Sequence, residues 1–212
     1  MSLTEVLIDE LRDLYSAENQ LVKSLPKSIK GSTDPEMKNL FREHLEQTKA
    51  QVLRLREVFQ HIGKKPTGQH CSGMEGCIKE MTEALEKDEE GSLKDVGIIG
   101  AALRVEHYEI AGYSAALAIA KSLGHKEIVT LLTETLEEEK ETAKKVLGGA
   151  KPILKQAASQ GTEEDEEKPK KAPKEKTPQE QESEQKSEQD EQEAEPEMQT
   201  ASADKKTKLS KK

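Results

Sequence analysis

The 212-residue sequence has almost no aromatic side chains: Trp is absent, and two Phe and three Tyr make up 2% of the chain. It also has no run near the roughly 20 apolar residues of a membrane helix. The N-terminus shows no basic region followed by an apolar segment, the pattern of a secretory signal. We therefore expect a soluble, cytoplasmic protein with no membrane partner. In that compartment Cys71 and Cys77 would stay reduced.

From Gln160 onward the sequence lacks Val, Ile, Phe, Tyr and Trp. Such a segment cannot bury enough apolar surface to offset the roughly 1–2 kcal/mol per residue that ordering a backbone costs. We predict one folded domain over residues 1–159 and a disordered, charged, low-complexity tail over 160–212, available to contact unknown partners. The net charge of −9 argues against a nucleic-acid partner, which would require clustered Lys and Arg.

Apolar residues recur at three- and four-residue spacing in four long segments, as in amphipathic helices. We predict long helices over residues 4–29, 34–62, 92–123 and 126–147, a shorter one over 72–87, and after Gly148-Gly149 a last helical piece over 153–158 that is either separate or a continuation of the fourth long helix. Strand-like alternation is absent from the sequence. Two pairs of long helices with short turns, joined by a long connection that carries a small helix, predict an all-α, ferritin-like four-helix bundle with a short crossover helix.

Polar residues interrupt these apolar stripes on every long helix. They are Glu18, His44, Glu106, Glu109 and Glu139. An ionised carboxylate in an apolar core is costly unless it is paired or bound to a metal. Divalent iron and manganese accept carboxylate and imidazole together, and ferritin-like di-metal sites use inward carboxylates with i, i+3 pairs. Glu106 with Glu109 and His44 with Gln47 have that spacing, and Gln51 follows His44 at i+7.

Simpler interpretations exist for each of these residues taken alone. A Glu in a helix stripe is often a boundary residue that keeps its carboxylate in water, and Arg104 could pair with a buried Glu without a metal. His70, Cys71 and Cys77 could bind zinc. However, the two cysteines lie six residues apart, which is not the short spacing of zinc sites. We interpret them as structural thiols.

Five segments of the chain resemble the YciE/YciF group of ferritin-like stress proteins. The segments are Tyr15–Gln20 with Leu25–Lys27, His44–Thr48 with Arg54-Leu55, Cys71–Gly76, Arg104–Tyr113, and Leu131–Glu139. The resemblance implies a four-helix bundle, a homodimer, a dinuclear iron-type site and a role in bacterial stress response. By position it implies Glu18, Glu106, Glu109 and Glu139 as ligands. Gln47 stands where the family commonly has a Glu, and either His44 or Glu46 is a candidate to compensate for the lost charge.

These observations support a first hypothesis, a ferritin-like stress-response protein that binds two iron or other divalent metal ions and handles oxygen or peroxide. The expected metal residues are Glu18, His44, Gln47, Glu106, Glu109 and Glu139. Enzymatic turnover stays open at this stage. The alternative is a non-catalytic helical homodimer that acts as a structural or interaction module, associating through the small side chains of residues 92–123. A storage ferritin is disfavoured by the long crossover helix and the tail.

Overall fold

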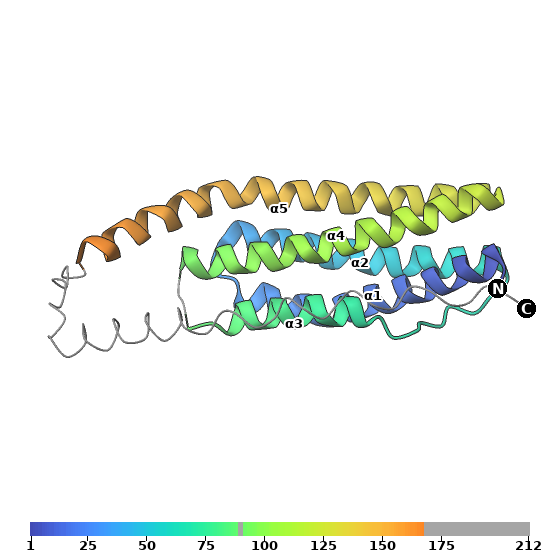
Figure 1. Cartoon of the computed structure of the whole chain (residues 1–212), viewed down its shortest axis with the longest axis horizontal. Helices are drawn as coiled ribbons and strands as arrows, with labels where there is room; N and C mark the ends of the chain where they lie inside the picture. Colours follow the sequence, from blue (N-terminus) through green and yellow to red (C-terminus); the bar gives the residue numbers. More distant parts are fainter. Residues whose placement is uncertain (89–90, 168–212) are drawn as a thin grey trace, which may run out of the picture. The chain divides into compact units, whose positions relative to one another are not determined.

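The computed structural model describes residues 1–88 and 91–167, with side chains as far as Ser159. Within this part of the chain the backbone forms helices and no strands (Figure 1). The helices are α1 (Leu3–Gly31), α2 (Pro35–Ile62), α3 (Ser72–Glu86), α4 (Ser92–Leu123) and α5 (Lys126–Glu167). The predicted all-α fold is confirmed. The tail predicted beyond residue 167 lies outside the described residues.

The helices are connected as two antiparallel pairs, α1 with α2 and α4 with α5 (Figure 1). Between the pairs, α3 carries the chain back along the bundle and packs against α1 and α4. As a result, α4 runs parallel to α2. One long crossover between two short-looped hairpins is the ferritin-like arrangement.

Local sequence signals account for most helix ends. The Ser2 hydroxyl accepts a hydrogen bond from the Glu5 backbone N–H at 3.2 Å, and the Glu5 carboxylate accepts one from the Ser2 backbone N–H at 2.6 Å, which forms a capping box. Asp34 caps α2 by accepting from the Met37 backbone N–H at 2.9 Å. Gly63 (φ 69°) and Gly124 (φ 73°) end α2 and α4 in the left-handed region, where glycine has no steric cost.

The last long helix does not stop at Gly148-Gly149. Helix α5 continues through both glycines and through residues 160–167, where the tail was predicted to begin. Val146, Ala150 and Ile153 are buried on one face across this segment. Two glycines inside a helix cost roughly 1 kcal/mol each. Burial of the flanking apolar side chains, at about 25 cal/mol per Å², offsets that cost.

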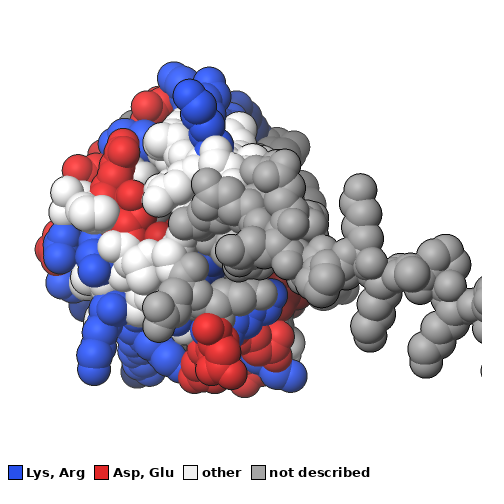
Figure 2. Space-filling model, turned by 90° about the vertical axis from the view of Figure 1, so that its left-hand side faces the viewer, with Lys and Arg blue, Asp and Glu red and all other residues white. Residues whose placement is uncertain are grey.

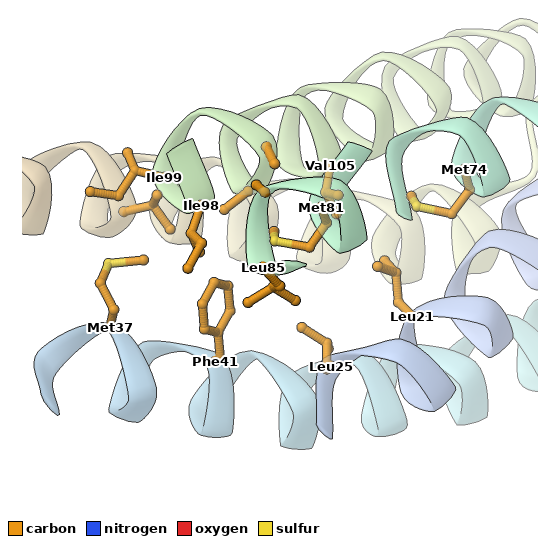
Figure 3. Close-up of a cluster of buried hydrophobic side chains, with 14 of the residues drawn as sticks. Leu21, Leu25, Met37, Phe41, Met74, Met81, Leu85, Ile98, Ile99 and Val105 are labelled. Atoms are coloured by element: carbon orange, nitrogen blue, oxygen red, sulfur yellow. The ribbon is translucent and has the colours of Figure 1, made fainter. Parts of the chain in front are cut away.

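The interior of the bundle is divided into two apolar clusters. The first surrounds the crossover helix and includes Leu21, Leu25, Met37, Phe41, Met81, Ile98 and Val105 (Figure 3). Val146 and Ile153 of α5 belong to the same cluster. The second lies toward the start of α1 and includes Leu7, Leu11, Leu14, Leu55, Phe59, Tyr113, Leu132 and Leu136. Along α1, Leu14 belongs to the second cluster and Leu21 to the first, so Glu18 lies between them. Glu18, together with His44, Glu106, Glu109 and Glu139 at the corresponding level of the other long helices, forms a polar layer at mid-bundle.

A buried carboxylate that the sequence did not single out ties the α1–α2 turn to α4. Asp95 accepts hydrogen bonds from the backbone N–H of Thr33 at 3.0 Å and of Asp34 at 3.1 Å, and from the Thr33 hydroxyl. Three donors satisfy the charge that burial would otherwise leave uncompensated. This contact fixes the first hairpin against the start of α4.

The described surface carries charges of both signs. On the face shown in Figure 2, basic and acidic side chains both border the visible described area, with uncharged residues between them. None of the described helices combines the length and the apolar character needed to span a membrane.

Candidate metal centre

The polar layer contains five ionisable side chains from all four long helices. They are Glu18 on α1, His44 on α2, Glu106 and Glu109 on α4, and Glu139 on α5. None is more than 3% exposed. Each lies between residues of the two apolar clusters because the three-four spacing of its helix directs it inward.

Four of these residues converge. Ligand atoms of His44, Glu106, Glu109 and Glu139 all lie within 4.8 Å of one another. The His44 Nδ1 atom is 2.9 Å from Glu106 Oε1, and its Nε2 atom is 3.9 Å from Glu109 Oε2. Glu106 and Glu109 face the same point because residues three apart on a helix are neighbours. Three helices thus contribute to one group of ligand atoms.

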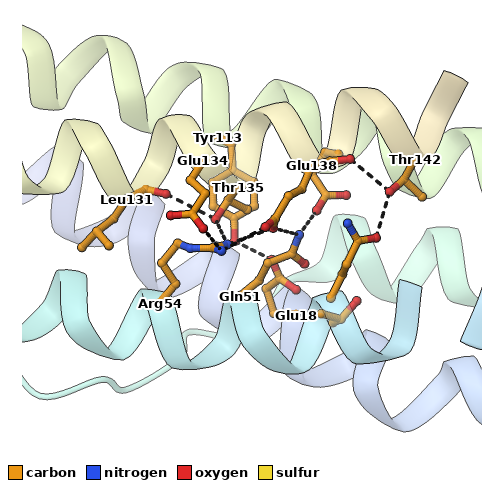
Figure 4. A network of polar contacts seen from close by, with 12 residues as sticks. Glu18, Gln51, Arg54, Tyr113, Leu131, Glu134, Thr135, Glu138 and Thr142 are labelled. Carbon is orange, nitrogen blue, oxygen red and sulfur yellow. Dashed lines mark hydrogen bonds and ion pairs between the residues drawn. The ribbon is translucent and has the colours of Figure 1, made fainter. Parts of the chain in front are cut away.

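Glu18 lies beside this group and is held by a tyrosine. The Tyr113 hydroxyl donates a hydrogen bond to Glu18 Oε1 (Figure 4). The charge of Glu18 contributes to the raised pKa of Glu109, next after burial, which shows that the two carboxyls are electrostatic neighbours. Glu18 is nevertheless not one of the four residues that meet within 4.8 Å.

The structure does not bring Gln47 into the group. Gln47 is half-buried, and its Oε1 atom accepts a hydrogen bond from Thr142 at 3.2 Å. Gln51, one turn further along α2, is buried instead and donates from Nε2 to Glu139 Oε1 and, at 3.0 Å, to Glu138 Oε2. Sequence reasoning noted the position of Gln51 but missed this role.

Several atoms in the layer have no hydrogen-bond partner among the described residues. They are Glu18 Oε2, His44 Nε2, Glu106 Oε2, both oxygens of Glu109, and Glu139 Oε2. A buried polar atom left in this state costs about 1–3 kcal/mol and is rare in native proteins. Carboxylate oxygens together with an imidazole nitrogen suit iron or manganese. The residues present therefore fit a divalent metal ion.

Comparison with known proteins identifies the family. The family model described as "Domain of unknown function (DUF892)" matches residues 2–159. Protein YciF of Escherichia coli K12 is 39% identical over 142 residues, covering 66% of this chain and 86% of YciF. The chain belongs to this family. The resemblance stated from the sequence segments is confirmed.

Solved structures of similar proteins have the same fold. The crystal structure of the E. coli stress protein YciF matches with a TM-score of 0.71 at 37% identity, covering 73% of this chain and 98% of YciF. YcfI from Rhodopseudomonas palustris matches with a TM-score of 0.67 at 41% identity, covering 69% of this chain and 93% of YcfI. A protein from Xanthomonas campestris, at 20% identity and TM-score 0.58, covers 76% and 99% of the two chains and supports the fold alone.

The electrostatics of the layer favour bound protons when no cation is present. Burial raises the pKa of Glu18 to about 8, against the lowering effect of the Tyr113 hydrogen bond. Burial, with neighbouring carboxylates, also raises the pKa of Glu109 and Glu139 well above the usual value. Burial opposes the charged form of His44, but the surrounding carboxylates outweigh it and raise the imidazole pKa to about 9. A bound cation would displace such protons.

The two cysteines do not form a metal site. Within the described part of the chain, His70, Cys71 and Cys77 do not converge as a ligand group. Cys71 is buried and caps α3, accepting from the Met74 backbone N–H at 3.3 Å, with its Sγ atom 2.9 Å from the Tyr108 hydroxyl. This geometry agrees with the structural interpretation of Cys71.

Proposed function

We propose that this chain is a ferritin-like stress-response protein that holds a dinuclear, iron-type metal site in the polar layer of its bundle. The observation that carries the proposal is the convergence within 4.8 Å of ligand atoms from His44, Glu106, Glu109 and Glu139, all buried and each with an oxygen or nitrogen that has no hydrogen-bond partner among the described residues. The stress-response role is supported by the relative YciF, which is described as a stress protein.

The charge balance of the layer also supports a metal pair. Four buried carboxyls face one imidazole, so full ionisation would leave three uncompensated negative charges. Such an excess in an apolar interior is strongly unfavourable. As a metal ligand His44 would be neutral, so two divalent cations would balance the four ionised carboxylates, with His44, Glu106, Glu109 and Glu139 as ligands and Glu18 completing the set.

Side chains around the ligands would orient them. Tyr113 holds one oxygen of Glu18, and Gln51 holds one oxygen of Glu139, which leaves the other oxygen of each carboxyl without a hydrogen bond from a described residue. Such outer partners typically change metal affinity 10–100-fold. The apolar clusters on either side of the layer keep bulk water out.

When bound, a pair of redox-active ions would supply electrons to oxygen or peroxide, which is the co-substrate class we propose. The protein's own contribution is positional and electrostatic. Carboxylates stabilise the higher charge of an oxidised metal.

Metal counting under anaerobic conditions tests the proposal. After equilibrium dialysis against ferrous iron, we expect about two ions per chain, as in other di-metal bundles. Glu109→Gln and Glu139→Gln keep the side-chain shape but each remove a ligand charge, and should weaken binding by at least about tenfold. Glu137→Gln is the matched control, since Glu137 is exposed two residues before Glu139 on α5. Unchanged iron binding in the Glu109→Gln, Glu139→Gln double variant, with its helical content intact, would refute the ligand assignment.

The non-catalytic homodimer is the second candidate. It is supported by the exposed small residues Ala111, Ala115 and Ala118 on one side of α4, because small side chains permit close helix approach. Light scattering on the full chain should give a dimer mass, and Ala115→Arg should give a monomer. A dimer that binds no iron would favour this second function over the first.

A further inference from the structure

A continuous polar network connects the buried layer with the protein surface between α2 and α5 (Figure 4). At its inner end Gln51 donates to both Glu139 and Glu138. At its outer end the Arg54 guanidinium binds Glu138 with two hydrogen bonds, of 2.9 and 3.0 Å, and reaches Glu134 at 2.7 Å. The Glu138 carboxylate therefore joins Gln51 to Arg54, and Arg54 joins Glu138 to Glu134.

Exposure rises along the carboxylates of this network. Glu139 is buried beside Gln51, the side chain of Glu138 is 26% exposed and that of Glu134 57%, while Arg54, which bridges the outer two, is 12% exposed. The layer is bordered along the bundle axis by the two apolar clusters, whose buried side chains carry one oxygen, the Tyr113 hydroxyl, which already donates to Glu18. We call the polar network of Gln51, Arg54, Glu134, Glu138 and Glu139 the α2–α5 seam. From the surface inward, Glu134, Glu138, Gln51 and Glu139 each provide a side-chain oxygen.

The inner end of the seam also has atoms free to bind a cation. Glu139 Oε2 and Gln51 Oε1 are buried and lack a hydrogen-bond partner among the residues described. The two atoms belong to side chains already joined by a hydrogen bond. A cation at Glu138 would therefore find its next oxygen ligands on adjacent side chains.

We propose that the α2–α5 seam is the route by which divalent cations reach and leave the buried layer, with Arg54 as a displaceable plug at its outer end. This inference rests on the proposed function. It adds a role for four residues, Gln51, Arg54, Glu134 and Glu138, that the ligand set does not contain.

Passage of a cation past Arg54 is an exchange of ion-pair partners at Glu138, so no covalent bond changes and no oxidant or reductant is needed. Glu134 collects a hydrated cation at the surface, since its carboxylate is more than half exposed. Glu138 then exchanges its guanidinium partner for the cation, and Arg54 swings outward into water with its charge retained. Gln51 turns its amide so that Oε1 faces the route, and Glu139 receives the cation. Return of Arg54 to Glu138 closes the seam.

The rates of cobalt uptake and release test this route. Uptake is followed by the visible absorption of bound Co²⁺ after mixing with metal-free protein, and release by transfer to a chromogenic chelator in excess. Arg54→Met keeps the aliphatic length of the plug but removes its forked charge. It should speed uptake and release alike, by about tenfold or more, which is the effect of lowering one barrier for both directions. In that background Glu138→Gln should slow both rates, because the transfer carboxylate is lost.

Arg42→Met is the control, since Arg42 is exposed on α2 and hydrogen-bonds only to Asn39 nearby in sequence. If Arg54→Met takes up and releases cobalt at the wild-type rates, the proposed route is wrong. A change in the uptake rate alone or the release rate alone would also overturn it, because Arg54 would then affect metal affinity and not access. If Arg54→Met fails to fold, Arg54→Lys should still exchange cobalt faster than the wild type, and equal rates would count against the plug. A wild-type protein that binds no cobalt, ferrous iron or manganese removes the proposed function and the route together.

Discussion

Replacing Glu18 by Gln should stabilise the metal-free protein at neutral pH and weaken metal binding. Glu18 is fully buried, and its pKa is raised from 4.5 to about 8, chiefly by burial. Below pH 4.5 the Glu18 carboxyl is protonated in both the folded and the unfolded chain, so it does not lower the free energy of unfolding. Between pH 4.5 and 8 only the unfolded chain ionises freely, so stability falls as pH rises. At pH 7.5 this amounts to about 4 kcal/mol, from ~1.4 kcal/mol per pH unit.

The amide introduced by Glu18→Gln would resemble the protonated carboxyl, because its oxygen can still accept from Tyr113. Urea unfolding in the presence of a chelator, followed by circular dichroism, should show a stability difference between variant and wild type that grows from near zero at pH 4.5 to about 4 kcal/mol at pH 7.5. The exposed Glu137→Gln variant should show no such trend. A difference that stays flat with pH, or that falls, would refute the electrostatic account of the layer. With excess ferrous iron the order should reverse in favour of the wild type.

Two further outcomes follow from the structure. Adding ferrous iron under anaerobic conditions should raise the melting temperature, and this increase should become larger from about pH 5 to about pH 8. The reason is that iron binding must displace protons from Glu18 and His44, whose pKa values are about 8 and about 9. An increase that becomes smaller with rising pH would contradict the ligand set. Gly73→Ala should destabilise the fold by about 1–3 kcal/mol, because its Cβ would collide with the Tyr108 ring. Gly76→Ala, in open space on the same helix, should stabilise it by about 1 kcal/mol in the same urea titrations.

Features encoded by neighbouring residues could be predicted from the sequence, whereas features set by other helices could not. The caps at Ser2 and Asp34 involve residues three apart, and both form. The continuation of α5 through Gly148-Gly149 depends on burial of Ala150 and Ile153 in a cluster built by other helices. Tertiary burial overrode local propensity there.

The same distinction holds inside the site. The inward positions of Glu18, Glu106, Glu109 and Glu139 followed from the apolar stripes. The preference for Gln47 over Gln51 came from its i, i+3 spacing from His44 and from the family resemblance, although at about 100° per residue Gln51 lies within about 20° of His44 around the helix and Gln47 about 60° away. Helical period therefore already favoured Gln51. No local signal pairs Arg54 with Glu138, because the two are 84 residues apart in sequence.

The stability of the layer itself argues for a ligand over a purely structural role. A polar layer separates two apolar clusters that would otherwise join, and replacing buried ionic groups by apolar ones often stabilises a protein. Pairing within the layer is incomplete, since Arg54 lies at its rim and His44 is the sole cation amid four carboxyls among the described core residues. A scaffold alone would gain stability from losing these groups. Without a cation the raised pKa values favour protonated Glu18, Glu109 and Glu139, and a metal ion held by the three converging helices is the compensation that the proposed function supplies.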